Sequence, residues 1–545
     1  MKQAPTIGDY LIQRLQALGV RHVFGVPGDY VLGFMHQLEC SDLQVINTCD
    51  EQGAGFAADA YARLNGLGVV CITYCVGGLK VANTTAEAFA EKSPVVVISG
   101  APGTNERVKN PLLHHKVREF DTQLKVFEQL TIASTVLSDP QTAFREIDRV
   151  LAAALRYKRP VYIELPRDMV KVSGSTPHSP QPVQQDSDPA ALREALREAV
   201  HLISAARQPV ILAGVELHRF GLQDALLQLA ESTNMPVAAT MLGKSVIAEQ
   251  HPLFIGVYEG AMGHEDVREY VESSDCLILL GTFMSDINLG VFTANLDQGR
   301  SIYVTSEKTS IRYHTYEDIR LEEFIRGLID AHIPPRASSP LPHPAAPAPF
   351  TPVPGTKITV QRLFQALNSF LDDDTIVLAD PGDALLAGVD LFIHSRTEFF
   401  SPAYYTSLGF AVPGSLGAQF ANPNLRPLVL VGDGAFQMTG MELSTTARYR
   451  LNPVVVVLNN GGYATERPMQ DGRFNDIQPW KHSRIPEIIG AGKGFDVETE
   501  DQLLAALNSA RAYTDGFSIL DVHLDPNDCS PALRRLTASL RQRMH

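Results

Sequence analysis

The chain has 545 residues, of which 45% are hydrophobic and 20% charged, and 46 Lys and Arg against 61 Asp and Glu give a formal net charge of −15. These proportions exclude a disordered or fibrous protein, and the acidic balance argues against a nucleic-acid partner, which requires clustered cations. The N-terminal MKQAPTIGDY lacks the apolar core of a signal peptide, and no apolar run approaches the roughly 18 residues of a membrane span, so we expect a cytoplasmic protein without membrane contact.

Short apolar runs alternate with amphipathic stretches along the whole chain. Thr6 is expected to cap a first helix together with Asp9, and Gly19 to end it. The apolar runs are, in order, VRHVFGV, GVVCITY, PVVVISG and PVYIEL, then PVILAG, PVAAT, CLILLG and SIYVT, and finally TIVLAD, PLVLVGDG and PVVVVLNN. Such β-branched runs, followed by Gly or Asn, predict parallel strands that are covered on both faces.

Two proline-containing stretches divide these elements into three blocks. Residues 173–189 are polar and Pro-rich, and residues 332–355 carry nine prolines. Proline fixes φ and removes a backbone donor, so neither stretch is expected to join a sheet. We therefore predict three α/β domains near residues 1–172, 190–331 and 356–545, each a doubly wound, mostly parallel sheet. Ligands of such sheets lie at the carboxyl ends of the strands.

The six cysteines indicate neither a disulfide scaffold nor a zinc site. They are too few for the former, and they show no CxxC spacing for the latter. We expect buried free thiols in a reducing compartment.

The third block contains a candidate metal site. A strand ending at Val431 leads into Gly432-Asp433-Gly434, and a second strand ends at Asn459-Asn460. One βαβ unit spans this interval, so the Asp433 and Asn460 side chains are expected to converge at the carboxyl ends of two neighbouring strands. A carboxylate, an amide oxygen and a loop carbonyl form a hard oxygen site of the kind that Mg²⁺ prefers.

The same segment also has the features of a phosphate site. The glycines allow the backbone to approach a phosphate, and a helix beginning at Ala435, with its regular pattern from about Gln437 to Arg450, offers N–H groups to it. Either motif alone has a plainer interpretation, because GDG can be a strand-to-helix turn and NGG a hairpin turn. Their combination after two apolar strands favours the ligand site.

These motifs resemble the signature of the thiamine diphosphate (ThDP) dependent enzymes, GDG followed by NN, and the resemblance covers nearly the whole chain. It implies a pyrimidine-binding, a central and a diphosphate-binding domain in that order. It also implies that Asp433, Asn460 and the backbone oxygen of Gly462 hold Mg²⁺. The cofactor contacts that it implies are Glu51, Gly382, Asp383, Thr406, Leu408, Gly432, Gly434, Ala435, Asn460 and Tyr463.

Glu51 in the run CDEQGAGFAADAYARLNG matches the family's activating acid, which hydrogen-bonds the aminopyrimidine ring and promotes its imino tautomer. The plainer interpretation is an acid at a helix N-terminus that interacts with the helix dipole. The Ala- and Gly-rich helix that follows favours the family role. In YYTSLGF, Leu408 matches the residue that keeps the cofactor bent, and the Thr406 carbonyl matches the one that meets its amino group. A buried core residue is the alternative for Leu408.

Four further residues match the acid–base set of the pyruvate, indolepyruvate and phenylpyruvate decarboxylases. Asp29 follows VFGVPG, His114 and His115 stand in NPLLHHKVREFD, and Glu466 follows NNGGYAT. Loss of CO₂ leaves an enamine that must be protonated, and the product hydroxyl must later lose its proton, so both steps need titratable groups. We expect one histidine to face the substrate and the other to support it, since adjacent side chains of an extended loop point apart. Taken singly, each of these features is also common in solvated loops.

The same resemblance bears on the substrate. Leu385 stands where pyruvate decarboxylases carry a large aromatic residue, and Thr465 stands where they carry Ile. Both differences remove side-chain volume, so a bulkier acid is expected to fit, although one or two methylene groups change selectivity by only about 1–3 kcal/mol. Met469 and Leu533 are further candidates for the pocket wall. Pro381 replaces a hydroxyl residue that touches the diphosphate in some relatives.

The sequence thus predicts a lyase that converts a 2-keto acid, aromatic or long aliphatic such as indolepyruvate or phenylpyruvate, to the aldehyde and CO₂ through a ThDP enamine. A ThDP-dependent carboligase or acetolactate-synthase-type transferase is one alternative, and an inactive ThDP-binding assembly protein is another. In this family the cofactor lies between the first domain of one subunit and the last domain of another. The resemblance therefore implies a homodimer as the smallest active unit and a homotetramer as the expected assembly.

Overall fold

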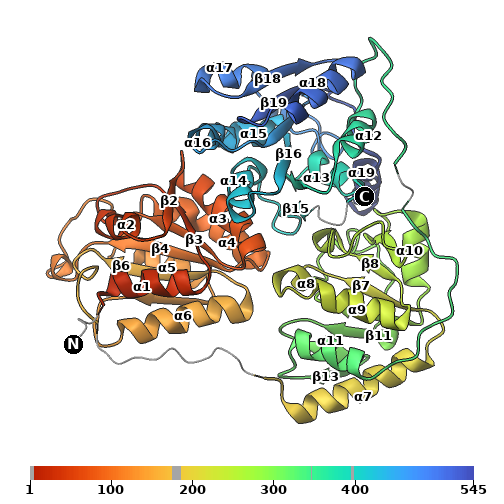
Figure 1. The fold of residues 1–545 in the computed structure, drawn as a ribbon, viewed down its shortest axis with the longest axis horizontal. Coiled ribbons are helices and arrows are strands. Elements are labelled where there is room, and N and C mark those ends of the chain that lie inside the picture. The colour runs from red at the N-terminus through yellow and green to blue at the C-terminus, as the bar shows by residue number, and fades with distance from the viewer. Residues whose placement is uncertain (1–4, 175–185, 345–346, 394–397, 545) are drawn as a thin grey trace. The chain divides into compact units, whose positions relative to one another are not determined.

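The computed structural model describes residues 5–174, 186–344, 347–393 and 398–544 (Figure 1). Its described residues form three β-sheets with helices packed on them. By their internal contacts the residues divide into two compact units. Unit 1 comprises Met1–Gln184, Gly409–Leu425 and Thr439–Leu451, and unit 2 comprises Gln185–Leu408, Arg426–Met438 and Asn452–His545.

Unit 1 contains a six-stranded parallel sheet in the order β2-β1-β3-β4-β6-β5. Its strands are β1 (His22–Gly25), β2 (Gln44–Asn47), β3 (Gly68–Ile72), β4 (Val95–Ala101), β5 (Ala133–Val136) and β6 (Val161–Pro166). Side chains alternate between the two faces. One face is covered by α1 (Ile7–Ala17), α2 (Leu32–Glu39) and α6 (Ala143–Tyr157), and the other by α3 (Glu51–Asn65), α4 (Ala82–Ala90) and α5 (Thr122–Glu128) (Figure 1).

The first sheet of unit 2 has seven strands in the order β13-β12-β11-β10-β7-β8-β9. They are β7 (Pro209–Ala213), β8 (Val237–Ala239), β9 (Phe254–Val257), β10 (Cys276–Leu280), β11 (Ser301–Val304), β12 (Thr309–Ile311) and β13 (His314–Tyr316). The pairs that involve β12 are antiparallel, and the others are parallel. Helices α7 (Pro189–Ala205), α9 (Gln223–Thr233) and α11 (Leu321–Asp330) cover one face, α10 (Glu265–Glu272) packs on the other, and the short α8 (Glu216–Arg219) follows β7.

The second sheet of unit 2 is parallel, in the order β15-β14-β16-β17-β19-β18. Its strands are β14 (Thr375–Ala379), β15 (Phe399–Phe400), β16 (Arg426–Gly432), β17 (Val454–Asn459), β18 (Lys493–Val497) and β19 (Ser518–His523). The helices of this chain region are α12 (Val360–Phe370), α13 (Asp383–Gly388), α14 (Ala411–Ala421), α15 (Asp433–Thr439), α16 (Leu443–Arg448), α17 (Ile485–Ile489), α18 (Glu500–Ala512) and α19 (Pro531–Met544). Of these, α14 and α16 belong to unit 1.

The structure confirms the predicted fold class. Every apolar run predicted as a strand forms one, and all three sheets are wholly or mainly parallel. The first helix has the expected capping box between Thr6 and Asp9, and Gly19 adopts a positive φ of 83° just after it ends. Within its described residues, the segment 332–355 carries neither helix nor strand, and much of 173–189 lies outside the described residues. Among the described residues, no helix combines the length and apolar character needed to cross a membrane.

Two expectations were wrong. The helix after the GDG motif begins at Asp433 and not at Ala435, and a 3₁₀ turn separates α15 from α16 instead of one helix continuing to Arg450. In this first turn Asp433 Oδ1 accepts the Gly434 N–H at 2.8 Å. The cysteines are all free, but Cys40 and Cys49 are exposed rather than buried.

Candidate active site

The predicted metal ligands lie together at the ends of two neighbouring strands. In the parallel pair β16–β17, Gly432 stands opposite Leu458, so the residues that follow both strands emerge at the same edge of the sheet. The Asp433 carboxylate is buried and accepts the Gly434 and Gly461 N–H groups at 2.8 and 2.7 Å. Burial raises the pKa of this carboxyl, and the backbone donors partly oppose the rise.

Asn460 supplies the observation that tests whether a cation fits. Its side chain is buried, and its Oδ1 has no hydrogen-bond partner among the described residues. A buried acceptor without a donor is costly, and a cation satisfies it directly. Gly462 follows with φ of 150°, and a Cβ there would lie 1.9 Å from the Asn475 carbonyl oxygen, so only glycine fits. These donors are all oxygens, which suits Mg²⁺.

A cavity of about 310 Å³ opens beside these oxygens. It is lined by Met241, Met262, Ile287, Pro381, Gly382, Asp383, Ala384, Leu385, Leu386, Ala403, Thr406, Leu408, Gly432, Gly434, Ala435, Leu458, Asn460, Gly462, Tyr463, Ala464, Thr465, Glu466 and Leu536. All of the predicted cofactor contacts other than Glu51 are in this set, as are Leu385, Thr465 and Glu466. The wall has strained backbone, because Thr406 has a φ of 58°, which is unusual for a β-branched residue and typical of functional sites.

Three predicted residues have other surroundings. Leu533 is fully buried in the hydrophobic core and does not line the cavity. Met469 is also outside the lining set, and its N–H donates to the Glu466 carbonyl oxygen at 3.0 Å. Asp383 does line the cavity, but its carboxylate accepts the Ser530 N–H at 2.9 Å and the Ser530 hydroxyl, so its oxygens are engaged within the protein.

Sequence reasoning missed Met241, Met262 and Ile287, cavity residues from the segments that connect the strands of the seven-stranded sheet. Met241 lies two residues after β8, near the carboxyl end of a predicted strand. That position after a predicted strand was the feature of the sequence that could have identified Met241 as a cavity residue. Ile287 lies in a loop that no periodic pattern marks.

Glu51 occupies the first turn of α3 in unit 1. Asp50 caps this helix by accepting the Gln52 N–H at 2.8 Å, and the buried Glu442 carboxylate accepts the N–H groups of Cys49 and Asp50, both at 3.1 Å. These bonds fix the turn that leads into the helix, so they hold Glu51 in position at the start of the helix.

The partner of Glu51 is a residue that the sequence did not indicate. Lys80 Nζ lies 2.7 Å from Glu51 Oε2 and also bonds the Asp50 carboxylate. The hydrogen bond to Asp50, and then that to Glu51, raises the pKa of Lys80. The GGLK segment follows β3, so its place after a strand was the only sequence signal.

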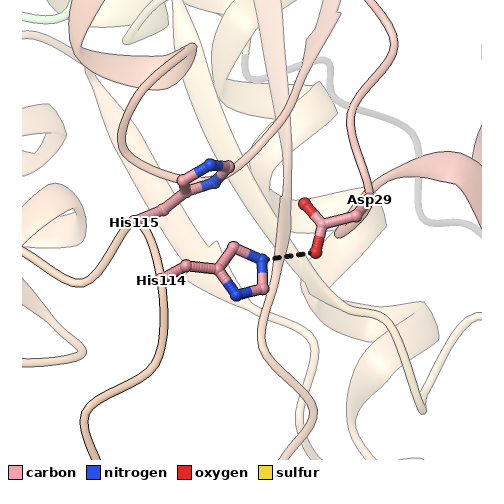
Figure 2. Close-up of side chains that lie close together, drawn as sticks. All are labelled: Asp29, His114 and His115. Atoms are coloured by element: carbon pink, nitrogen blue, oxygen red, sulfur yellow. Dashed lines mark hydrogen bonds and ion pairs between the residues drawn. The ribbon is translucent and has the colours of Figure 1, made fainter.

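Asp29, His114 and His115 form one cluster in unit 1. Figure 2 shows the Asp29 carboxylate and the His114 ring joined, with His114 Nε2 2.7 Å from Asp29 Oδ2. The two histidine rings lie edge to face, with their centroids 4.8 Å apart. The loop is not extended here, because His115 has a φ of 65°, and both rings therefore reach the same cluster.

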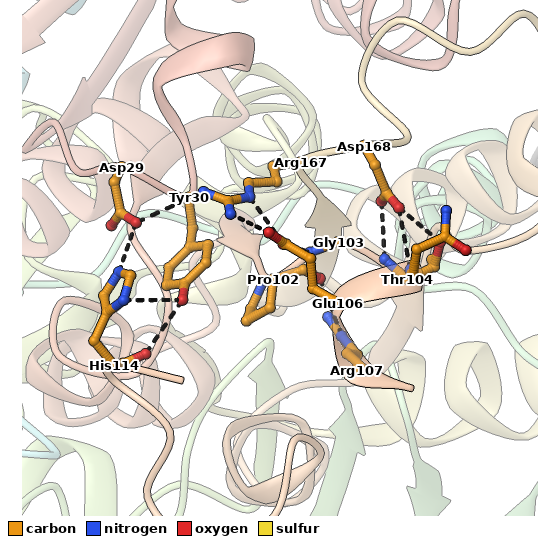
Figure 3. A network of polar contacts seen from close by, with 11 residues as sticks. Asp29, Tyr30, Pro102, Gly103, Thr104, Glu106, Arg107, His114, Arg167 and Asp168 are labelled. Carbon is orange, nitrogen blue, oxygen red and sulfur yellow. Dashed lines mark hydrogen bonds and ion pairs between the residues drawn. The ribbon is translucent and has the colours of Figure 1, made fainter. Parts of the chain in front are cut away.

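Further side chains hold this cluster in place, as Figure 3 shows. The Tyr30 ring stacks on His114 with centroids 4.8 Å apart, and its hydroxyl donates to the His114 carbonyl oxygen at 3.3 Å. Arg167 lies with Nη1 3.9 Å from Asp29 Oδ2, and Glu106 holds the guanidinium through Nε at 2.9 Å. The hydrogen bond to Arg167 lowers the pKa of the Glu106 carboxyl. Asp29 is thus flanked by an imidazole and a guanidinium.

The predicted residues consequently form two sets. Asp29, His114, His115 and Glu51 belong to unit 1, whereas the oxygen donors, the cavity and Glu466 belong to unit 2.

Comparisons with known proteins cover the whole chain. Residues 5–125 match the N-terminal TPP binding domain of thiamine pyrophosphate enzymes, residues 196–331 match their central domain, and residues 384–522 match their C-terminal TPP binding domain. An indole-3-pyruvate decarboxylase of Azospirillum brasilense is 35% identical over 99% of each chain. An alpha-keto-acid decarboxylase of Mycobacterium leprae is 34% identical over 98% of this chain and 95% of its own. A Mycobacterium tuberculosis protein of the same name is 34% identical over 98% and 97%.

Proposed function

The chain belongs to the thiamine pyrophosphate enzymes, and within this family we propose that it acts on an aromatic or long aliphatic 2-keto acid, such as indolepyruvate or phenylpyruvate. It is a ThDP-dependent carboxy-lyase, a 2-keto acid decarboxylase, which releases an aldehyde and CO₂. The observation that supports the substrate proposal is the cavity of about 310 Å³, whose lining includes the apolar side chains of Met241, Met262, Ile287 and Leu385 as well as polar groups.

The residues beside the cavity suit the cofactor and its metal. ThDP, when bound, supplies a nucleophilic carbon and an electron sink for the bond to CO₂. We propose that Mg²⁺ is held by the Asp433 carboxylate, Asn460 Oδ1 and the Gly462 carbonyl oxygen, because Asn460 Oδ1 otherwise stays buried without a partner. Gly432 and Gly434 leave room for the diphosphate where β16 ends.

The proton transfers are assigned to the five titratable side chains that the sequence singled out, which are Glu51, Asp29, His114, His115 and Glu466. Glu51 is proposed to hold the proton of the aminopyrimidine ring. The carbon that loses CO₂ must be protonated, and the product hydroxyl must give up its proton. We propose that His114, hydrogen-bonded to Asp29 and with the His115 ring beside it, donates and takes back a proton, and that Glu466, which lines the cavity, serves the same purpose.

The apolar part of the cavity is where the substrate side chain is proposed to lie. Leu385, Met241, Met262 and Ile287 present hydrocarbon and thioether groups, and Thr465 is the small polar exception. Methionines adapt to different shapes, which favours several bulky acids over a single one. Pyruvate would leave most of this surface without contacts.

The assembly is proposed to be a homodimer at the least and a homotetramer in full. Mixing two inactive variants, Glu51→Gln and Asp433→Asn, tests whether one subunit completes the site of another. Activity that returns on mixing supports the proposal, because a mixed dimer would regain one intact pair of Glu51 and Asp433. Persistent inactivity of verified mixed dimers would place both residues of a site in one chain. Size measurement by light scattering separates dimer from tetramer.

A CO₂-release panel tests the substrate. Pyruvate, indolepyruvate, phenylpyruvate and a branched keto acid are compared with ThDP and Mg²⁺ present. We expect kcat/KM for the aromatic acids to exceed that for pyruvate by about 10- to 200-fold. A preference for pyruvate would contradict the substrate proposal. A hydroxyketone as the main product, in place of the aldehyde, would favour the carboligase alternative.

A further inference from the structure

A second cavity, of about 300 Å³, lies in unit 2 on the central sheet. Its lining residues come from three adjacent strands and from the segments beside them. They are Leu279, Met284, Leu296, Gln298, Ser301, Tyr303, Lys308, Ser310 and Arg312. None of them lines the cavity next to Asp433. The proposed function gives this second cavity no role.

The strand register explains why these side chains meet. Leu279 of β10 stands opposite Tyr303 of β11, which in turn stands opposite Ser310 of β12, so all three share one face of the sheet. Residues two apart in a strand also share a face, which adds Ser301 beside Tyr303 and brings Lys308 next to Ser310. The alternate residues point into the hydrophobic core on the opposite face.

The cavity exists because helical cover ends at this point. Val267 and Val271 of α10 pack with Leu277 and Leu279 and so cover the face as far as β10. Over β11 and β12 the cavity is bounded instead by residues 284–298 of the preceding loop region. A patch of sheet lined by hydroxyl groups and cations is left open.

Among the described residues, the two cations of this cavity are exposed side chains without a contact ion pair, and the Arg312 charge interacts electrostatically with the Glu198 carboxylate. In the described part of the chain, neither the Lys308 ammonium nor the Arg312 guanidinium makes an ion pair or a side-chain hydrogen bond. The nearby Asp297 carboxylate is engaged by Arg300, whose Nε lies 2.8 Å from it. Unpaired cations that line one cavity create a positive potential there and attract an anion.

A buried hydroxyl adds a second, independent indication. Ser310 is only 8% exposed, it lines the cavity, and its Oγ has no partner among the described residues. A buried hydroxyl without a partner is destabilising, and a ligand oxygen can satisfy it. Cations together with a hydroxyl donor are the groups that proteins use to bind phosphate.

The remaining walls indicate what is attached to the anion. Leu279, Leu296 and Met284 are apolar, and the Tyr303 ring also lines the cavity. Two cations balance a dianion, whereas a monocarboxylate would leave one of them unpaired. The volume is at the lower end of the range of about 300–1,000 Å³ for ligand pockets, so the ligand is small.

We propose that this cavity binds a small phosphate monoester with an aromatic or apolar group, with Lys308 and Arg312 on the phosphate and Leu279 and Leu296 against the apolar part. The proposal is independent of the decarboxylase assignment. It predicts binding whether or not the enzyme is turning over.

The experiment is isothermal titration of the full chain, saturated with ThDP and Mg²⁺, with phenyl phosphate as the probe. We expect saturable binding with a Kd of about 1 mM or tighter. Inorganic phosphate tests whether the anion alone suffices, and benzoate tests the alternative of a carboxylate; both are expected to bind at least about tenfold more weakly. Equal affinity for benzoate would overturn the assignment to a phosphate. No saturable binding of phenyl phosphate would overturn the site.

A double variant locates the binding. Lys308→Gln with Arg312→Gln is expected to weaken phenyl phosphate binding by about 10- to 100-fold while leaving CO₂ release unchanged. The matched control is Arg193→Gln with Lys357→Gln, two exposed cations elsewhere in the same unit, and it is expected to bind like the parent. All variants are compared by thermal unfolding, so that misfolding is recognised. Equal losses in both double variants would show that the probe responds to overall charge, and would contradict the site.

Discussion

The oxygen site of unit 2 and the acid–base cluster of unit 1 are built in opposite ways. Asp433 and Asn460 are 1% and 8% exposed, and they follow two adjacent strands. The Asp29 and His114 side chains are 40% and 59% exposed and stand on loops. The first arrangement fixes positions, as a metal site requires, and the second leaves side chains accessible, as proton transfer requires.

The hydrogen-bond partners of the two aspartates, Asp433 and Asp29, differ as well. The carboxylate of Asp433 is held by the N–H groups of Gly434 and Gly461, which do not titrate. The carboxylate of Asp29 is held by the His114 side chain and faces the Arg167 guanidinium, and interactions between such exposed charged groups are screened by salt. We therefore expect changes in the oxygen site to alter cofactor binding, and changes in the cluster to alter turnover.

The largest effect is expected for Asp29→Asn. Asparagine keeps the shape but loses the carboxylate that holds the His114 ring, so kcat should fall by about 10²- to 10⁴-fold while ThDP affinity is unchanged. Steady-state kinetics and titration with ThDP measure the two quantities. Asp42→Asn, an exposed acid in the same unit, is the control. A loss of ThDP affinity equal to the loss of kcat would break the distinction between the two regions.

The opposite result is expected for Asp433→Asn. Removing a metal ligand should cost more than the 10- to 100-fold that a ligand's supporting partner costs, so we expect Mg²⁺ and ThDP affinity to fall by more than about 100-fold. Magnesium-dependent ThDP titration measures this loss. Asp515→Asn is the exposed control. Tight cofactor binding by Asp433→Asn would refute its role as a ligand.

The raised pKa of Asp433 adds a pH dependence to the same site. Because burial disfavours the ionised carboxylate, protons compete with Mg²⁺ at a higher pH than for an ordinary aspartate. Cofactor affinity should therefore decline as the pH falls toward this raised pKa. The folding stability of the protein without metal depends on pH in the opposite direction. The stability that protonated Asp433 contributes is present at low pH and is lost as the pH rises.

The oxygen site could be predicted from the sequence because its determinants are local. Asp433 and Asn460 each follow an apolar strand, and one βαβ unit brings consecutive parallel strands together. The fold class followed from the same apolar runs. Strand β19 was missed because the buried Asp521 interrupts its pattern, and β18 was missed because most of this edge strand is exposed.

The rest depends on tertiary contacts that no local pattern records. Nothing near Lys80 indicates that its ammonium group meets Glu51, and nothing near Arg167 indicates that it faces Asp29. His115 adopts a positive φ without the Gly or Asn that usually marks one, so no local pattern indicates that both rings meet in one cluster. Leu533 is apolar, and apolarity alone does not distinguish a core position from a cavity wall.

A moderate effect is expected for Leu385→Phe, which narrows the cavity beside the oxygen site. The larger ring should lower kcat/KM for phenylpyruvate relative to pyruvate by about 10- to 100-fold, the range for a change of a few methylene groups in an apolar pocket. The pH profile should not move, because no titratable group changes. Competition between the two acids measures the ratio, and Leu32→Phe, at an exposed position, is the control. A shifted pH profile would connect this wall to the acid–base cluster.

The smallest effect is expected for Lys80→Met. This variant tests whether Glu51 resembles the buried oxygen site or the exposed acid–base cluster. The Lys80 side chain is 46% exposed and that of Glu51 only 13%, so the pair stands between the two types. Exposed ion pairs are screened and contribute about 0–1 kcal/mol, so the free energy of unfolding in urea should fall by less than about 1 kcal/mol. Because the pair raises the pKa of Lys80, its contribution is full at neutral pH and disappears as the pH rises above that pKa.

Lys125→Met, which removes the exposed pair with Asp121, is the matched control. A small stability loss with a clear change in kcat would place Glu51 with the titrating residues, whereas a loss of several kcal/mol would place it with the buried, position-fixing ones.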